Sequence, residues 1–544
     1  MSSIRQFILG AQLAVPVSDL ESMPMRRSVL LTSLIASFAG AVHAQSFPTA
    51  DPVIQRIWDE GMNRSQAMDL IQVLTDSIGP RLTGSPGTAA GQEWLVRTYA
   101  RYGVTAQNQR YGTWLGWRRG VSHLDLVKPR VRSLEATMLA WSGGTKGKPV
   151  EGSTVILPLV QDSAAFQAWL PNARGKFVLI SQPMPTCRPD ASYREFALPQ
   201  TFETMARERN AARDDWAERL RRTGLSNRDL PVALERAGAL GVLTSLWSQG
   251  WGVTKIFQSR TRDIPSMDLS CEDYGLVYRL TEKNQGPVVR AFADAEFQGE
   301  VPVFNTIAEI RGSERPDEYV MLSAHFDSWD AASGATDNAT GTVVMLEAIR
   351  ILRQVYPNPK RTILVGHWNG EEQGLNGSRA FVEDNPKVVA GLQALFNQDN
   401  GTGRIVNMSA GGLIGAAPFL AEWLSKVPNE ISQHITFQFP GTPAGGGSDH
   451  ASFLCHSAPG FSLGSLNWEY GTYTWHTNRD TYDKVIPDEI RNNAVLTAIL
   501  TYLAAEDTRT VPRQQRIMPV GPGGGTGTWP ACVPATRNST QSTR

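Results

Sequence analysis

Residues 301–510 alternate between short apolar runs and segments whose apolar residues recur at helical spacing. The short runs, which predict buried strands, lie at 319–324, 362–366 and 392–396. Helical spacing is clear at 341–352, and a second helix is expected at 378–384. Strands that alternate with helices predict an α/β fold, in which helices flank both faces of a mostly parallel central sheet.

The chain before this block has two further patterns. Residues 45–147 contain helical stretches around a loop at 79–87 that is rich in glycine and proline, and we expect them to form the N-terminal part of the same domain. Residues 148–300 differ, because they combine short β-rich runs with a charged helical segment at 203–222. The β-rich runs lie at 154–157, 176–180 and 237–243, and a further short element begins at 264. We therefore expect 148–300 to be a small inserted β-rich domain.

Residues 1–44 are predicted to be a signal peptide preceded by an extension. An arginine pair at 26–27 precedes the apolar run 29–41, and small residues follow before the expected cleavage site. The upstream residues lie outside this pattern, so we expect translation to begin at Met23 or Met25. The apolar run is too short to span a membrane. We expect an exported protein, periplasmic or extracellular, without a membrane anchor.

Length and composition limit the possible classes. Single hydrophobic cores stop growing at roughly 250–300 residues, so a chain of 544 residues should contain two folded units. With 41% hydrophobic and 19% charged residues, the chain is typical of soluble globular proteins. The 52 basic residues balance 52 acidic ones, so no nucleic acid partner is expected. The segment 203–222 interleaves both charges, which favours a solvated helix face.

Four cysteines are too few for a disulfide scaffold, and none has C-x-x-C spacing, so a metal would be held by other side chains. They are Cys187, Cys271, Cys455 and Cys532. Whether Cys187 and Cys271 form a bridge is left open by the sequence. Residues 511–544 are rich in proline, glycine and threonine and predict a flexible tail.

Metal-binding side chains follow each of the three predicted strands. The carboxyl ends of strands are where ligands bind in open α/β sheets. His325 and Asp327 follow the first strand, and spacing two in an extended segment places them on the same side. A metal-bound imidazole usually gives its other N–H to a carboxylate, so we expect Asp327 to orient His325. Asp337, in a turn that leads into a helix, is expected to bridge two ions.

The second and third strands add carboxylates, and a distant loop adds a second histidine. Adjacent Glu371 and Glu372 point in different directions, so we assign Glu372 as a ligand and Glu371 as the general base that activates water. Asp399 follows the third strand, and His476 lies in a polar loop. Two histidines and three carboxylates, one of them shared, suit two zinc ions roughly 3.5–4 Å apart and predict hydrolysis.

These residues resemble the co-catalytic dizinc exopeptidases, family twenty-eight of the metallopeptidases, over roughly residues 60–510. The family pattern is a His-x-Asp, a bridging aspartate, a Glu-Glu pair, an aspartate and a late histidine. The resemblance implies one zinc ion held by His325, Asp337 and Asp399 and another held by Asp337, Glu372 and His476. It also implies Glu371 as the base and a cis peptide bond after Asp337.

Some segments point to particular branches of the family. His325 to Asp330 and 359–362 most resemble carboxypeptidase Q and the glutamate carboxypeptidases. The insert resembles a protease-associated domain, on the segments 175–178 and 237–239. Some aminopeptidases have an aromatic residue and a cysteine pair where this chain has glycines at 445–447, which puts recognition of a substrate amine in doubt.

Three other positions, Asp449, His450 and His367, carry side chains that could belong to the site. The segment that contains Asp449 and His450 resembles a family segment lining the substrate pocket, so both are candidates for substrate binding. His450 equally suits a polar packing role. His367 lies within a predicted strand and is expected to be packed rather than to bind metal.

The leading hypothesis is an exported zinc-dependent metallo-exopeptidase that hydrolyses peptides or dipeptides, of the aminopeptidase or dipeptidase type. The first alternative is a carboxypeptidase similar to carboxypeptidase Q or glutamate carboxypeptidase, and cleavage of an N-acetylated dipeptide would favour it. The second alternative is a receptor-like binding protein on the same fold, which failure to bind zinc would favour. The oligomeric state is left open.

Overall fold

The structure, a computed structural model, describes residues 47–518 and 527–539. The predicted signal peptide at 1–44 lies outside the described residues, as do two parts of the predicted tail, 519–526 and 540–544. No helix within the described ranges is both long and apolar enough to cross a membrane.

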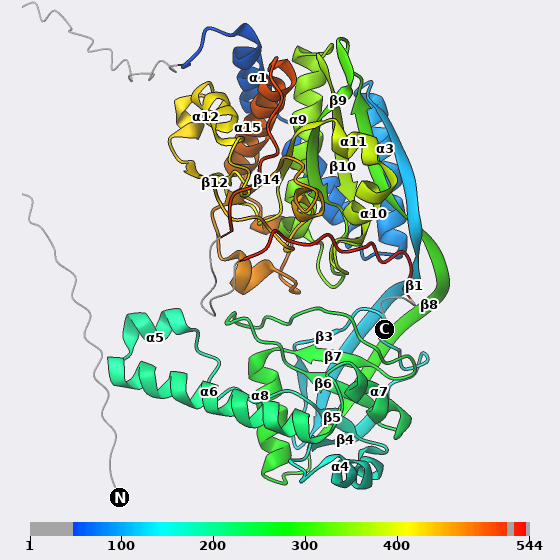
Figure 1. Ribbon diagram of the computed structural model, residues 1–544. Coiled ribbons are helices and arrows are strands. Elements are labelled where there is room, and N and C mark those ends of the chain that lie inside the picture. The colour runs from blue at the N-terminus through cyan, green and yellow to red at the C-terminus, as the bar shows by residue number, and fades with distance from the viewer. Residues whose placement is uncertain (1–46, 519–526, 540–544) are drawn as a thin grey trace, which may run out of the picture. The chain divides into compact units, whose positions relative to one another are not determined.

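Parallel strands form the middle of a large mixed sheet (Figure 1). The strand order β14, β11, β9, β10 is parallel throughout, and three of these strands were predicted from their apolar runs. Their bounds are Gly460–Ser465 (β14), Leu392–Asn397 (β11), Arg315–His325 (β9) and Arg361–Trp368 (β10). At one edge lie β12 (Ile405–Ser409) and β13 (Thr436–Gln438). The predicted α/β fold class is confirmed.

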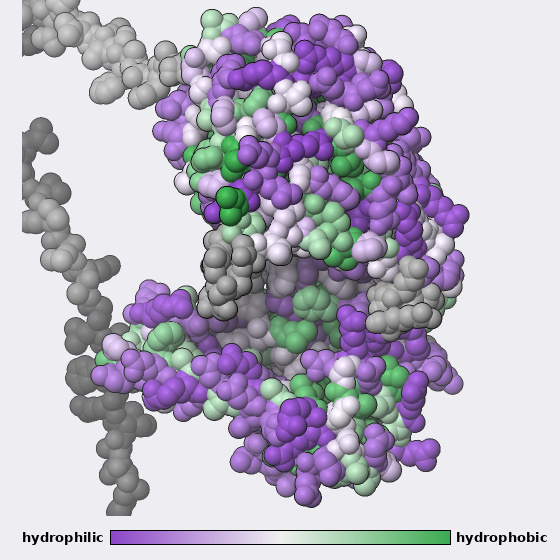
Figure 2. All heavy atoms as spheres, in the orientation of Figure 1, coloured by the Kyte–Doolittle hydropathy of each residue, from purple (hydrophilic) through white to green (hydrophobic). Residues whose placement is uncertain are grey.

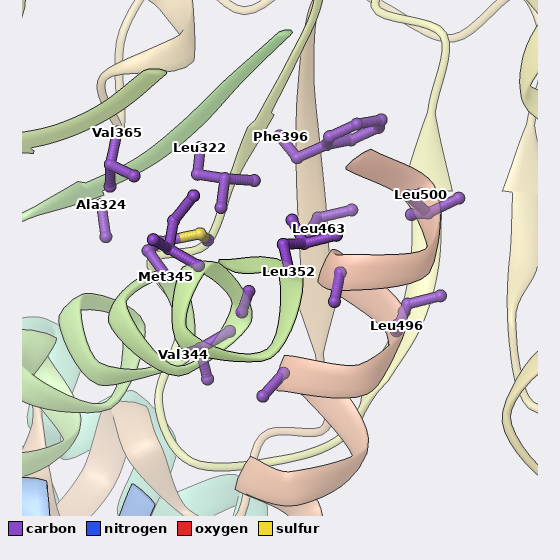
Figure 3. Close-up of a cluster of buried hydrophobic side chains, with 14 of the residues drawn as sticks. Leu322, Ala324, Val344, Met345, Leu352, Val365, Phe396, Leu463, Leu496 and Leu500 are labelled. Atoms are coloured by element: carbon purple, nitrogen blue, oxygen red, sulfur yellow. The ribbon is translucent and has the colours of Figure 1, made fainter. Parts of the chain in front are cut away.

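One face of these strands is covered by the helices α9 (Thr340–Val355) and α15 (Pro487–Glu506). The helix α1 (Pro52–Asn63) packs against both of them. Figure 3 shows Leu322 and Ala324 of β9 beside Met345 of α9, with Leu496 of α15 in the same cluster. Each such buried side chain contributes about 1.5–3 kcal/mol to folding, so this cluster is a main source of stability.

The opposite face is buried as well. Met321, next to Leu322 along β9, belongs to a separate apolar cluster that contains Phe381 and Phe453. These two rings come from α10 (Asn376–Asp384) and α14 (His450–Leu454). Burial on both faces explains why these strands are continuous apolar runs. Other helices in this part of the chain are α2 (Ala67–Gln72), α3 (Pro86–Arg101), α11 (Pro386–Ala390), α12 (Ala417–Ser425) and α13 (Asn429–Ser432).

Two long antiparallel strands, β1 (Thr105–Lys128) and β8 (Val288–Ile310), run side by side (Figure 1). One end of β8 pairs with β10 and the other with β4 (Val150–Ile156), so one sheet passes from the predicted main domain into the predicted insert. The boundary predicted at residue 300 falls inside β8. The boundary was misplaced because β8 continues from the insert into the main domain without a change in amino-acid composition.

The insert is less β-rich than predicted, since helices flank its short strands. Its strands are β4, β5 (Phe177–Leu179), β6 (Gly241–Thr244) and β7 (Ser266–Leu269). The strand β3 (Ala136–Met138) pairs with β7 although it lies before the predicted start at residue 148, and β2 (Arg132–Leu134) lies beside β1. Its helices are α4 (Ser163–Trp169), α5 (Asp190–Phe196), α6 (Pro199–Arg222), α7 (Asp229–Arg236) and α8 (Cys271–Glu282). The visible surface of α6 is mostly hydrophilic, as its mixed charges predicted (Figure 2).

Both cysteine pairs form disulfides, Cys187–Cys271 and Cys455–Cys532. The second one corrects the prediction of a flexible tail for residues 527–539, because it ties them to the chain just after α14. Arg537 adds ion pairs with Glu383 and Asp384 of α10, each at 2.8 Å. The composition of 511–544 concealed these anchors, since a single cysteine and a single arginine hardly change it.

Candidate metal centre

His325, Asp337 and Asp399 meet at the carboxyl ends of β9 and β11. The His325 Nε2 atom lies 3.1 Å from Asp399 Oδ1 and 3.3 Å from Asp337 Oδ1. All three side chains are nearly or fully buried. The structure therefore brings together the three residues predicted to hold the first ion.

A second group of side chains lies on the other side of Asp337. His476 Nε2 lies 2.9 Å from Glu372 Oε2 and 3.4 Å from Asp337 Oδ2. The Asp337 carboxylate thus turns one oxygen toward each group. This is the geometry that a bridging carboxylate requires.

The donor atoms fit cations better than they fit one another. Candidate ligand atoms of His325, Asp337 and Glu372 all lie within 4.8 Å of one another. Within the described chain, Asp337 Oδ2 and Glu372 Oε1 are buried without a hydrogen-bond donor. Buried carboxylates without partners are costly, and a bound cation would remove that cost. Imidazole and carboxylate donors in this number suit zinc.

Asp480 holds the backbone around Asp337, a role that the sequence did not reveal. Its carboxylate accepts hydrogen bonds from Thr336 N at 2.7 Å and from Asp337 N at 2.9 Å. Burial raises the pKa of Asp480 to about 7. The Asp337–Asn338 peptide bond is cis, as the family resemblance implied. Spacing of four residues from His476 is the only sequence signal that marks Asp480.

Asp327 differs from its predicted role. The His325 Nδ1 atom lies 2.9 Å from the Asp327 main-chain oxygen, whereas the Asp327 carboxylate is 3.8 Å away. That carboxylate instead accepts backbone N–H groups from Glu371 at 3.1 Å and from Glu372 at 3.3 Å. The prediction was wrong because β9 ends at His325, so alternation along a strand no longer applies beyond it. Asp327 fixes the Glu-Glu turn.

The loop at 79–87 lies under the centre, although the sequence identified it only as a loop. Arg81 is fully buried and donates to the main-chain oxygens of Phe326, Ser333 and Gly334, each at 2.8 Å. Thr83 Oγ1 donates to the Asp327 carboxylate at 3.1 Å. Burial lowers the pKa of Arg81 to about 10, so it stays charged at neutral pH.

Glu371 is placed next to both groups of ligands. Burial raises its pKa well above the usual value, and the nearby charges of Asp399 and Asp449 raise it further. Burial likewise raises the pKa of Asp449, at the start of α14, to about 7. Burial also lowers the pKa of His450 to about 4. Both predicted substrate residues therefore lie beside the centre.

His367 is packed, as predicted. It is fully buried, and its Nε2 atom lies 2.7 Å from the Tyr99 hydroxyl. Burial lowers the pKa of His367 to about 3. Its ring is therefore neutral, and its Nε2 atom is engaged with Tyr99.

The segment 252–257 of the insert pairs with the loop that carries His476. Ile256 N donates to His476 O at 2.8 Å, and Thr254 N donates to the Asn478 side chain at 3.0 Å. The Phe257 and His476 ring centroids are 5.0 Å apart. The insert thus fixes one predicted metal ligand from outside the central sheet.

Comparison with known proteins shows that part of the chain is similar to a known family. Residues 305–501 match the family described as Peptidase family M28. Carboxypeptidase Q from Bos taurus is 25% identical over 464 residues, which cover 84% of this chain and 88% of that protein.

Solved structures share the fold. A peptidase M28 precursor from Shewanella amazonensis SB2B aligns with a TM-score of 0.63 at 22% identity, covering 85% of this chain and 98% of that one. BSAP, a zinc aminopeptidase from Bacillus subtilis, aligns with a TM-score of 0.52 at 18% identity, covering 82% and 95%. The matched residues 305–501 span β9 to α15, where the candidate ligands lie, so this part of the chain is a peptidase M28 domain.

Proposed function

We propose that the protein is a dizinc metallo-exopeptidase that hydrolyses peptides or dipeptides, of the aminopeptidase or dipeptidase type. One observation carries the proposal: the Asp337 carboxylate directs its two oxygens to two separate histidine–carboxylate groups. The match of residues 305–501 to a peptidase family supports the reaction class.

Each group of ligands would hold one ion. His325, Asp337 and Asp399 would hold the first ion, and Asp337, Glu372 and His476 would hold the second. When bound, two zinc ions would polarise the scissile carbonyl and lower the pKa of the attacking water.

Glu371 is the proton carrier in this proposal. It takes a proton from the attacking water and gives it to the leaving amine nitrogen. Asp327 holds the backbone N–H of Glu371, and Asp480 holds that of Asp337, so base and bridging ligand are both fixed before substrate arrives.

A carboxypeptidase is the second candidate. The long alignment with carboxypeptidase Q favours this candidate, because 464 aligned residues include both the insert and the M28 region of this chain. The solved aminopeptidases share only the fold at their level of identity.

Export from the cytoplasm is also proposed. The two disulfides support it, because disulfides persist in oxidising compartments. N-terminal sequencing of the mature protein should give Gln45 as the first residue, and a mature protein that retains residues 25–44 would contradict the proposal.

The function is tested on protein that begins at Gln45. Metal content and cleavage of free and N-acetylated dipeptides are measured before and after treatment with a chelator. Two zinc ions per chain and cleavage that is lost on chelation and restored by zinc support the enzyme. Preference for the free dipeptide supports the aminopeptidase or dipeptidase type, whereas cleavage of the acetylated one supports a carboxypeptidase. Less than one zinc ion per chain and no cleavage would contradict the enzyme and favour a receptor-like binding protein.

A further inference from the structure

A cavity of about 680 Å³ lies between the short strands of the insert and the loop that carries His476. This volume lies in the range of roughly 300–1,000 Å³ that is typical of small-ligand sites. Its wall is mostly apolar and includes Ile180, Met184, Leu220, Trp247, Phe257 and Trp475. The cavity therefore suits a ligand with a large apolar part.

The wall of this cavity adjoins the candidate metal centre. The Trp475 ring stacks on the His476 ring with centroids 3.9 Å apart, and the Phe257 ring meets the same imidazole at 5.0 Å. His476 in turn lies 2.9 Å from Glu372. The cavity wall and the second group of predicted ligands are thus joined through Trp475 and His476, which are neighbours in one loop.

The charges along the wall have one sign. The charged residues that line the cavity are Lys255, Arg228 and Arg260, and all three are basic. Lys255 is the one that contacts the His476 loop, since its ammonium donates to Trp475 O at 2.7 Å. A carboxylate close to the metal centre would therefore meet Lys255 first.

Lys255 is a buried cation with unused hydrogen-bonding capacity. Lys255 is only 7% exposed. Its ammonium carries three N–H donors, and one of them is hydrogen-bonded to Trp475 O. Within the described chain it makes no ion pair. The nearby Asp268 already accepts three hydrogen bonds, two of them from backbone N–H groups. The ammonium also lies 4.3 Å from the centroid of the Trp475 ring, but no carboxylate of the described residues is in ion-pair contact with it, so an anionic ligand would be stabilising here.

We propose that this cavity binds the C-terminal residue of a peptide substrate, with its α-carboxylate on Lys255 and an apolar side chain against the cavity wall. The inference rests on the proposed exopeptidase function and names the substrate class: short peptides with a free carboxylate and a large apolar C-terminal residue. Lys255 is then a specificity residue supplied by the insert.

The test compares Lys255→Met with the wild type on alanyl-leucine and on alanyl-leucinamide, two substrates that differ only in the terminal charge. A hydrogen-bonded charge pair is worth about 1.5–3 kcal/mol, so the variant should lose roughly tenfold to hundredfold in kcat/KM on the free acid, mainly through KM. Cleavage of the amide should fall much less than cleavage of the acid. Alanyl-alanine should be a poorer wild-type substrate than alanyl-leucine.

A matched control addresses the other role that Lys255 has, fastening the His476 loop. Ser248→Ala removes a neutral hydrogen bond from the insert to the same loop, Ser248 Oγ to Thr472 O at 2.8 Å. It should leave the ratio of acid to amide cleavage as in the wild type. An equal loss on both substrates in Lys255→Met, with lowered zinc content, would show that Lys255 only holds the loop and would overturn the proposal.

Failure of the proposed function gives a different result. If the zinc-loaded wild type cleaves neither dipeptide, the enzyme assignment fails, and binding of N-acetyl-leucine and N-acetyl-leucinamide is measured by calorimetry. Preference for the free acid that disappears in Lys255→Met would support the carboxylate site. Equal binding of both compounds, or of neither, would overturn it.

Discussion

Asp327 and Asp480 each accept two backbone N–H groups from the segment that carries a predicted ligand. Asp327 holds the turn of Glu372, and Asp480 holds the turn of Asp337. Carboxylates in such positions fix the ligand before the ion binds, and their loss typically costs metal affinity. They are positioning residues of the centre.

Replacing Asp480 by Asn should weaken zinc binding. The amide keeps one acceptor oxygen but presents N–H donors to a backbone N–H group that then lacks a partner, so we expect roughly a tenfold to hundredfold loss of affinity. Competition with a chromogenic chelator measures it. Asp483→Asn is the matched control, because that carboxylate is exposed and three residues away; equal affinities in both variants would contradict this role.

Glu371→Gln should keep both zinc ions and lose most turnover. The ligands stay in place while the proton carrier is gone, and general base catalysis is typically worth 10²- to 10⁴-fold. Metal analysis and kcat on a cleaved dipeptide measure the two effects separately. Glu372→Gln, in contrast, should lower zinc content, and unchanged turnover in Glu371→Gln would refute the assignment of the base.

His325, Glu371, Glu372 and Asp399 were predictable because polar side chains that follow buried apolar runs stand out in a sequence. Asp337 and His476 lie in loops and were candidates because they complete the family pattern. Asp480, Arg81 and Lys255 were not predictable, since each acts through backbone atoms or charges of segments far away in the chain. The predicted contact of the Asp327 carboxylate with His325 failed where regular strand geometry ends.

At the scale of elements, the loop that carries His476 depends on a partner segment. His476 itself has a φ of +57°, a left-handed conformation that a non-glycine residue adopts only where its surroundings hold it. The segment 252–257 provides that hold through Ile256 and Thr254. No local sequence pattern predicts this pairing, because the two segments are more than 200 residues apart.

The elements that were predicted correctly are those buried on both sides. The apolar runs of β9, β10 and β11 are distinctive because helices cover both faces. The long strand β8 was missed, since its burial changes from end to end as its partners change from β4 to β10. A domain boundary set by composition was therefore drawn through a continuous strand.

Across the whole molecule, the Cys455–Cys532 disulfide ties the end of the described chain to the residue after α14. Trp529 reinforces this anchor, because its indole N–H donates to Leu454 O at 3.0 Å. The start of α14 carries His450, beside the metal centre. The C-terminal segment thus braces a helix at the active side of the sheet.

Replacing Cys455 and Cys532 by serine should lower the stability of the zinc-loaded protein by about 2–4 kcal/mol, because the unfolded chain is no longer cross-linked. Urea unfolding measures the loss. Serine at Cys187 and Cys271 is the control, since this pair closes a loop of similar length within the insert. If only the control pair destabilises the protein, the bracing role of the C-terminal segment is refuted.

The continuity of β8 has a consequence for how such proteins are engineered and how they diversify. Because β8 belongs to both the sheet of the candidate metal centre and the insert, the insert cannot be exchanged as an independent module. A graft would have to preserve the register of β1 on β8 and also supply its own version of residues 252–257. Changes in substrate preference are therefore expected to accumulate by substitutions on the cavity wall, with the scaffold inherited intact.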